Sequence, residues 1–194
     1  MKSVLISIQP KWCELIASGK KTVEVRKTKP KLETPFKVYI YETQGRTETP
    51  FVDEEGHHIF KGRGQVIGEF VCDKIYNLTP HFDKPDFCNQ YLCDWKWGEG
   101  TACLSFTEMN DYLKGKNGYG WHISDLVIYD KPRELSEFYV YCGDNPKCDG
   151  CEAHYFSNTE CGKEDYCCSI IDGCKPLKRP PQSWCYVERR ENEN

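Results

Sequence analysis

The sequence predicts an α+β fold made of short strands and a few short helices, with a cysteine-rich insert. Residues 11–18 repeat apolar side chains at helical spacing, whereas residues 36–42, 65–76 and 119–129 have the strand-like alternation of apolar and polar side chains. Seven cysteines lie between residues 142 and 174. A chain of 194 residues has the length of one domain with additions.

A helix followed directly by a strand is expected near the N-terminus. Pro10 suits the first turn of a helix, and Gly19 suits the left-handed residue that follows a helix C-terminus. From Lys21 the period becomes two, so the two valines of this strand point to one face, toward the core. The opposite, polar face carries Thr22, Glu24 and Arg26.

Three charged side chains therefore gather where this strand begins. Glu24 and Arg26 lie roughly 6 to 7 Å apart along one strand face, and Lys21 joins them at its start. A carboxylate between two cations stays ionised and offers a polar ligand one acceptor and several donors. The pattern also fits a surface ion-pair cluster, which contributes little to stability.

The motif Gly19-x-Lys21-x-x-Glu24-x-Arg26, preceded by Ile8-x-Pro10-x-Trp12, resembles the signature of the ASCH domain family, a branch of the PUA-like superfamily. This resemblance is specific over residues 3–28 and looser over residues 64–138. It reappears over residues 179–187, which resemble the ending of phage-associated members. The resemblance implies a small, mostly antiparallel PUA-like β-barrel with short flanking helices, and a cleft beside the motif that binds RNA or a nucleotide.

The remaining elements are expected in a simple order. A basic loop, residues 27–35, leads to the strand 36–42, and residues 43–64 form a polar hairpin in which 51–52 pairs with 58–60. Residues 65–76 form the longest strand, at the centre of the barrel. The later elements are an aromatic-rich loop at 79–105, a helix at 107–114 with Thr107 near its N-cap, the strand 119–129, a helical turn at 131–138 and a final strand after Pro180 and Pro181.

Charge is distributed unevenly along the chain. The formal net charge is −4 and the pI is about 5.8, which argues against a protein that coats nucleic acid by charge alone. Residues 1–46 nevertheless carry ten Lys or Arg against four Asp or Glu. An anionic partner is therefore expected near this segment. No signal peptide or membrane span is recognised, so we expect a soluble, cytoplasmic protein.

The cysteine-rich segment predicts a structural zinc site rather than a hydrophobic core. Cys148 and Cys151 form a C-x-x-C pair around a glycine, and a cytoplasmic location favours thiolate ligands over disulfides. Four protein ligands would leave no open position for a catalytic water. A disulfide-stapled loop is the alternative. The predicted ligands are Cys148, Cys151, Cys168 and Cys174, with Cys142, His154, Cys161 and Cys167 as alternates.

These expectations divide the chain into four parts. The ASCH/PUA-like barrel covers residues 1–141, the zinc insert covers residues 142–176, the final barrel strand covers residues 177–188, and a disordered tail covers residues 189–194. In the final strand Gln182 and Trp184 either close the barrel or line the cleft.

The leading functional prediction is a binding module for RNA, a nucleotide or a modified nucleoside. Lys21 and Arg26 contact a phosphate or a base carbonyl, and Glu24 accepts from an amine or a ribose hydroxyl. Trp12 is either a stacking platform or a core residue of the first helix. The predicted ligand-binding residues are Trp12, Gly19, Lys21, Glu24 and Arg26.

Two enzymatic alternatives remain open. Some compact ASCH proteins resemble amidohydrolases of N4-acylated cytidines that use a lysine, a threonine and a glutamate. By that resemblance the catalytic residues are Lys21, Glu24 and Glu108, with Glu24 at the position of the threonine and Thr22 as its possible substitute. A ribonuclease would draw its acid and base from His57, His58 and His122.

Overall fold

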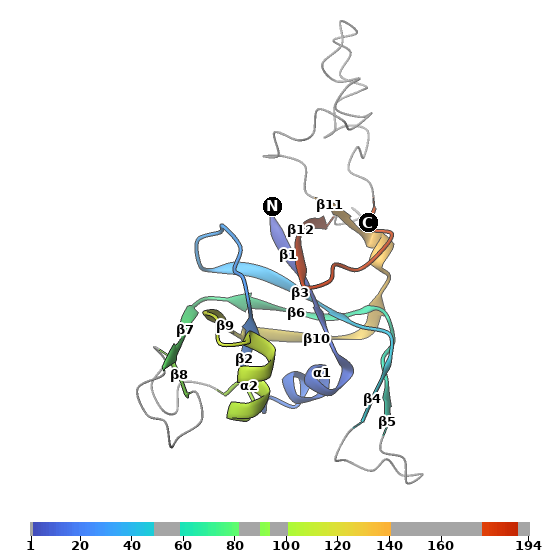
Figure 1. Ribbon diagram of the computed structural model, residues 1–194. Coiled ribbons are helices and arrows are strands. Elements are labelled where there is room, and N and C mark those ends of the chain that lie inside the picture. The colour runs from blue at the N-terminus through green and yellow to red at the C-terminus, as the bar shows by residue number, and fades with distance from the viewer. Residues whose placement is uncertain (1, 49–58, 82–89, 94–100, 141–175, 190–194) are drawn as a thin grey trace, which may run out of the picture.

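In the computed structural model, the described residues form two sheets, a short two-stranded ribbon and two α-helices (Figure 1). The structure describes residues 2–48, 59–81, 90–93, 101–140 and 176–189. The elements are β1 (Ser3–Ile8), α1 (Pro10–Ala17), β2 (Val23–Arg26), β3 (Phe36–Glu42), β4 (Arg46–Glu48), β5 (Ile59–Lys61), β6 (Val66–Cys72), β7 (Ile75–His81), β8 (Gln90–Cys93), α2 (Phe106–Leu113), β9 (Gly118–His122), β10 (Ser124–Arg133), the 3-10 turn η1 (Leu135–Glu137), β11 (Phe138–Val140) and β12 (Trp184–Arg189).

The larger sheet has six strands in the order β10-β6-β3-β1-β12-β11. Its only parallel pair is β1 with β3, and the other neighbours are antiparallel. Apolar side chains cover both faces of β1: Val4 and Ile6 pack with α1, whereas Leu5 packs with Phe138 on the opposite face. The short apolar run at the N-terminus is therefore a central, fully buried strand.

The smaller sheet has four strands in the order β2-β9-β7-β8. It places the motif strand β2 at an edge, where Glu24 lies opposite Trp121 and Arg26 opposite Tyr119. The valines of β2 pack with α2 through Met109 and Leu113, as their spacing predicts. The two helices are neighbours, since Lys11 Nζ of α1 lies 3.6 Å from Oε1 of Glu108 on α2 (Figure 1).

The expected closed barrel is wrong for the described residues, because the strands form separate sheets that do not close on themselves. Two predicted strands are each split at a bend. Residues 65–76 divide into β6 and β7 around Asp73 and Lys74, and residues 119–129 divide into β9 and β10 around Ile123. At each bend the chain crosses from one sheet to the other, and the bends are joined by His122, whose backbone N–H donates to Lys74 O at 2.9 Å.

The local signals of the first helix are confirmed. α1 begins at Pro10, and Gly19 follows it with φ of +71° while its N–H donates to Ile16 O at 2.9 Å. The start of α2 differs from the prediction: Ser105, not Thr107, is the N-cap. Thr107 lies inside the first turn, because Glu108 stands three residues after Ser105 and completes a capping box with it.

The bounds of several other elements differ from those expected. β4 at 46–48 pairs with β5 at 59–61 inside the segment where a hairpin was predicted. The strand expected at 51–52 lies outside the described residues. β8 interrupts the predicted loop at 79–105, and η1 is shorter than the turn expected at 131–138. β12 runs to Arg189, one residue past the expected end. No helix in the described part of the chain is long and apolar enough to cross a membrane.

Candidate functional site

A cavity of about 1090 Å³ lies between β2, the two helices and the segment that leads into β12. Its walls come from parts of the chain that are far apart in sequence. This size exceeds that of an ordinary small-molecule pocket and gives room for a nucleotide or a short chain segment. The lining residues are Ser7, Ile8, Gln9, Trp12, Lys21, Glu24, Val25, Arg26, Lys27, Thr28, Thr43, Leu104, Glu108, Asp111, Tyr112, Pro180, Pro181, Gln182 and Ser183.

The three charged residues of the motif all line this cavity and are nevertheless buried. Lys21 is 2% exposed, Glu24 6% and Arg26 7%. The alternation of β2 accounts for the common direction of Glu24 and Arg26, and residues of α2 and of 180–183 line the same cavity. The surface ion-pair interpretation is therefore wrong: these charges lie inside the protein.

The ammonium of Lys21 is held by the protein itself. Its Nζ donates to the carbonyl oxygens of Val23 at 2.8 Å and Ala102 at 2.7 Å, and lies 3.3 Å from Oε2 of Glu24. An ammonium has three N–H donors, and these three acceptors match them. Lys21 therefore fixes the backbone of β2, the 101–104 segment and the Glu24 carboxylate relative to one another.

Arg26 has a different balance of donors. Its Nη2 donates to Ser7 O at 2.6 Å and lies 3.0 Å from Oε1 of Glu24, while Nε is buried without a hydrogen-bond partner in the described part of the chain. The phenol of Tyr112 also interacts with this guanidinium, although burial is the main reason that the pKa of Tyr112 is raised. The Nε–H is thus a donor that none of the described residues uses.

Glu24 lies between the two cations, with one carboxylate oxygen on each. Oε2 is 3.3 Å from Lys21 and Oε1 is 3.0 Å from Arg26. An ionised carboxylate has about four lone-pair sites, so acceptor capacity remains. Among the described residues, this trio therefore combines a buried donor that has no partner with a carboxylate that keeps acceptor capacity.

Trp12 fits both interpretations made from the sequence. Its side chain is partly buried against the main core, yet its ring also lines the cavity. The ammonium groups of Lys11 and Lys21 lie 4.5 and 5.2 Å from the ring centroid. Trp12 therefore packs against the core and against two ammonium groups, and it also borders the cavity.

Gly19 contributes through its backbone. It is absent from the cavity lining, and a Cβ placed on it would meet nothing within 4 Å, so its role is the left-handed conformation that turns α1 into β2. Gly19 thereby brings Lys21 to the start of the strand. The backbone N–H of Lys21 closes the turn on Leu15 O at 2.8 Å.

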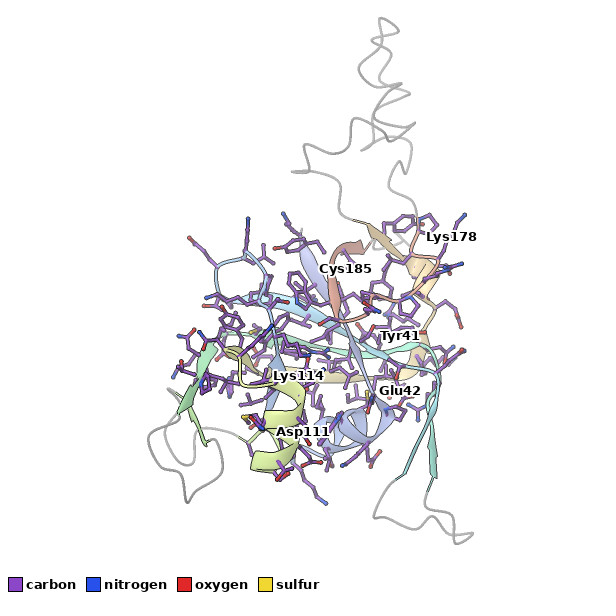
Figure 2. All side chains as sticks on the ribbon, viewed as in Figure 1. Tyr41, Glu42, Asp111, Lys114, Lys178 and Cys185 are labelled. Carbon is purple, nitrogen blue, oxygen red and sulfur yellow. The ribbon has the colours of Figure 1, made fainter. Side chains whose placement is uncertain are left out.

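The wall made by α2 uses its charge for folding. Glu108 Oε2 accepts from the backbone N–H of Ser105 at 2.9 Å and from its hydroxyl at 2.8 Å. These hydrogen bonds are the main cause of the lowered pKa of Glu108, and Lys11, 3.6 Å away, lowers it further. Asp111, labelled on α2 in Figure 2, also lines the cavity and is exposed.

The segment before β12 closes the cavity from the C-terminal side. Ser7 binds it twice, since its backbone N–H donates to Ser183 O at 2.9 Å and its hydroxyl to Pro181 O at 2.7 Å. Gln182 lines the cavity, which is one of the two positions expected for it. Trp184 does not; it packs beside Trp121 with ring centroids 5.9 Å apart and serves the core.

A protein-family model for the ASCH domain matches residues 6–113, which is more than half of the chain. The chain belongs to the ASCH domain family. No curated protein sequence matches it.

Solved structures of an ASCH protein from Zymomonas mobilis resemble this ASCH domain. The unmodified protein is 18% identical with a TM-score of 0.47, and the chains cover 98% and 89% of each other, this chain first. A single-substitution variant of it gives 20% identity, the same TM-score and the same coverage. A second variant gives 24% identity and a TM-score of 0.43, covering 70% of this chain and 77% of that one.

Several cavity residues of the ASCH domain carry little signal in the linear sequence. Ser7, Asp111 and Tyr112 reach the cavity only because β1 and α2 pack beside β2. Tyr112 had one available clue, its helical spacing from Met109 and Glu108, which places it near the same face of α2 as the cavity wall.

The predicted zinc ligands Cys148, Cys151, Cys168 and Cys174 lie outside the described residues, as do all four alternates. Within the described residues of the ASCH domain, no group of three or more His, Cys, Asp or Glu is arranged to hold a metal ion. Cys13, Cys72, Cys103 and Cys185 are free thiols. Burial raises the pKa of Cys185 to about 11 and, with the nearby Asp73 charge, that of Cys72 to about 12, so neither is a thiolate at neutral pH.

The side chains needed for the enzymatic alternatives are only partly brought together. Lys21, Glu24 and Glu108 line one cavity. Thr22 is absent from its lining and instead accepts from the backbone N–H of Thr101 at 2.9 Å. His122 pairs with Asp73 at 2.7 Å away from the cavity lining, and His57 and His58 lie outside the described residues.

Proposed function

We propose that this ASCH domain binds RNA or a nucleotide, with one nucleobase seated in the motif cavity. The observation that carries the proposal is the Nε–H of Arg26, which lies beside the Glu24 carboxylate and has no partner among the described residues. A buried donor without a partner costs free energy, on the order of 1–3 kcal/mol, and a ligand acceptor would recover it.

The chemistry of that pair suits the edge of a nucleobase. A base carbonyl or ring nitrogen accepts from Nε of Arg26, and an adjacent N–H or exocyclic amine donates to Glu24. Lys21 supports this contact indirectly: its ammonium is bound to Val23 O and Ala102 O, so it orients Glu24 rather than reaching for a phosphate. This changes the role first expected for Lys21.

Trp12 supplies the second part of the proposed contact. Its ring lines the cavity and is held in place by packing against the core. Stacking of a base on an aromatic face contributes about 1 to 3 kcal/mol and is tolerant of sequence. Recognition would then combine stacking on Trp12 with hydrogen bonds to Arg26 and Glu24.

The test is calorimetric titration with the four ribonucleoside 5′-monophosphates, N4-acetylcytidine and a five-nucleotide RNA. We expect at least one to bind, and Arg26→Lys to weaken that binding by about tenfold or more, because lysine keeps the charge but lacks the Nε–H and the planar fork. Lys131→Ala, an exposed lysine of β10, is the control. Absence of binding by every ligand, or equal binding by Arg26→Lys, contradicts the proposal.

Deacylation of N4-acylated cytidine is the alternative, favoured by one observation: Lys21, Glu24 and Glu108 line the same cavity. Against it, the Nζ of Lys21 is bound to two carbonyls and Glu108 is engaged as the cap of α2. Chromatography of N4-acetylcytidine after incubation with the protein distinguishes the two functions, since binding alone leaves the compound intact.

A further inference from the structure

The rim of the cavity carries charges of both signs. α2 presents the carboxylates of Glu108 and Asp111. From β2 the rim continues into the loop 27–35, the blue segment that joins β2 to β3 in Figure 1, where Lys27, Lys29 and Lys31 are exposed. A phosphate chain leaving the cavity would be repelled by the two carboxylates and attracted by the three lysines.

This loop is anchored to the larger sheet at two points. The indole Nε1 of Trp184 donates to Thr28 Oγ1 at 3.0 Å, and the backbone N–H of Lys31 donates to the phenol oxygen of Tyr186 at 2.7 Å. Between these points Pro30 is buried. Leu32, directly after the second point, packs against the main core. The lysines are therefore held on a fixed backbone, which lowers the entropy cost of binding through them.

Aromatic rings lie beside the lysines of this loop. Lys27 Nζ lies 4.9 Å from the ring centroid of Tyr112, and Lys29 Nζ lies 5.2 Å from that of Tyr119. Further along, the ring of Tyr186 is bonded to the Lys31 backbone through its hydroxyl and has Lys2 Nζ 4.5 Å from its centroid. Alternating cations and aromatic rings are the pattern by which proteins hold single-stranded nucleic acid.

We propose that a single-stranded RNA whose base occupies the cavity continues over the loop at Lys27, Lys29 and Lys31, with its phosphates on these lysines. Lys27 connects the two parts because it lines the cavity and also begins the basic loop. The inference rests on the proposed function and adds the path, the polarity of the rim and a preference for an oligonucleotide over a single nucleotide. The chain's overall charge of −4 makes this path a local feature rather than a general attraction.

The experiment compares one mononucleotide with a five-nucleotide RNA containing the same base, across three proteins. The test variant is Lys29→Ala with Lys31→Ala, which leaves the cavity lining intact. The control is Lys74→Ala with Lys131→Ala, which removes the same charge and also one lysine above a tyrosine, since Lys74 Nζ lies 4.7 Å from the Tyr76 ring centroid.

We expect the test variant to bind the five-nucleotide RNA about tenfold more weakly at low salt, and its log–log salt slope to fall by about 1.4, roughly 0.7 for each lost phosphate contact on a single strand. Its affinity for the mononucleotide should stay within about twofold of wild type, which also shows that the variant is folded. The control should match wild type for both ligands.

The outcomes separate this inference from the proposed function. If the mononucleotide binds but the five-nucleotide RNA binds equally to both double variants, the path over the loop is wrong and the cavity function stands. If wild type binds neither ligand, the proposed function fails and the path fails with it.

Discussion

Two walls of the cavity, α2 and β2, each carry a glutamate, and the two glutamates have different environments. Glu108 on α2 has a side chain that is 45% exposed and is bound by Ser105, its own helix cap. Glu24 on β2 has a side chain that is 8% exposed and lies between two buried cations. Glu108 serves the helix cap, whereas Glu24 caps no helix and is bound by Lys21 and Arg26 instead.

Burial makes the β2 wall costly. Taking three charges out of water is offset only when their hydrogen bonds are complete, and an apolar replacement of a buried ion cluster is often as stable. Here the cluster is incomplete, because Arg26 Nε has no partner in the described residues. A local departure from the best arrangement for stability is a mark of functional sites, which agrees with a ligand for this wall.

The largest effect is expected from Glu24→Gln. The substitution keeps the shape of the side chain but leaves the charges of Lys21 and Arg26 buried without their counter-ion. Breaking a buried ion cluster in this way costs about 3–5 kcal/mol. Urea unfolding followed by circular dichroism measures the change in the free energy of unfolding.

The matched control is Glu69→Gln, the same change in a second carboxylate that pairs with lysine. Glu69 Oε1 accepts from Lys37 Nζ at 2.7 Å, but the side chain of Lys37 is 42% exposed, so water can solvate the cation that is left. We expect a loss below about 1 kcal/mol. Equal losses of unfolding free energy in the two variants would show that Lys21, Glu24 and Arg26 stabilise the fold no more than a partly exposed ion pair does.

Sequence reasoning worked where the determinants are local. Pro10 and Gly19 mark the two ends of α1 because a fixed φ and a left-handed residue are properties of the single residue. The strand predicted at 36–42 coincides with β3, although its side chains are buried on both faces. The motif and its direction on β2 follow from the same period of two.

It failed where distant parts of the chain decide the outcome. The break between β6 and β7 falls inside an unbroken strand-like run, and the contact at the bend comes from His122, far along the sequence. The alternation of β2 predicts which side Glu24 faces but not that it is buried, in a cavity that α2 and residues 180–183 also line. The burial that distinguishes a cavity wall from a surface strand was therefore beyond local patterns.

A medium effect is expected from Ser105→Ala on the α2 wall. Loss of the N-cap hydroxyl, which accepts from Glu108 N at 3.2 Å, should lower the free energy of unfolding by about 1 kcal/mol. Thr107→Ala is the control, because the structure places Thr107 inside the first turn, and it should cost less than about 0.5 kcal/mol. A larger loss from Thr107→Ala than from Ser105→Ala would indicate that Thr107, not Ser105, is the N-cap.

The smallest effect concerns the pH dependence of Glu108. Its pKa is lowered in the folded protein by the Ser105 hydrogen bonds and then by Lys11, so the folded state favours the ionised carboxylate. The resulting stabilisation is fully present above the unfolded pKa of about 4.3 and is lost as the pH falls through the lowered folded pKa. Because the side chain is 45% exposed, the gain should stay below about 1 kcal/mol. Urea unfolding of wild type and Glu108→Gln from pH 7 to pH 3 measures it: the difference should be constant at the upper end and vanish toward the lower end. A difference that grows on acidification would mean that the folded state prefers the protonated acid, and the contrast with Glu24 would then lose its basis in helix capping.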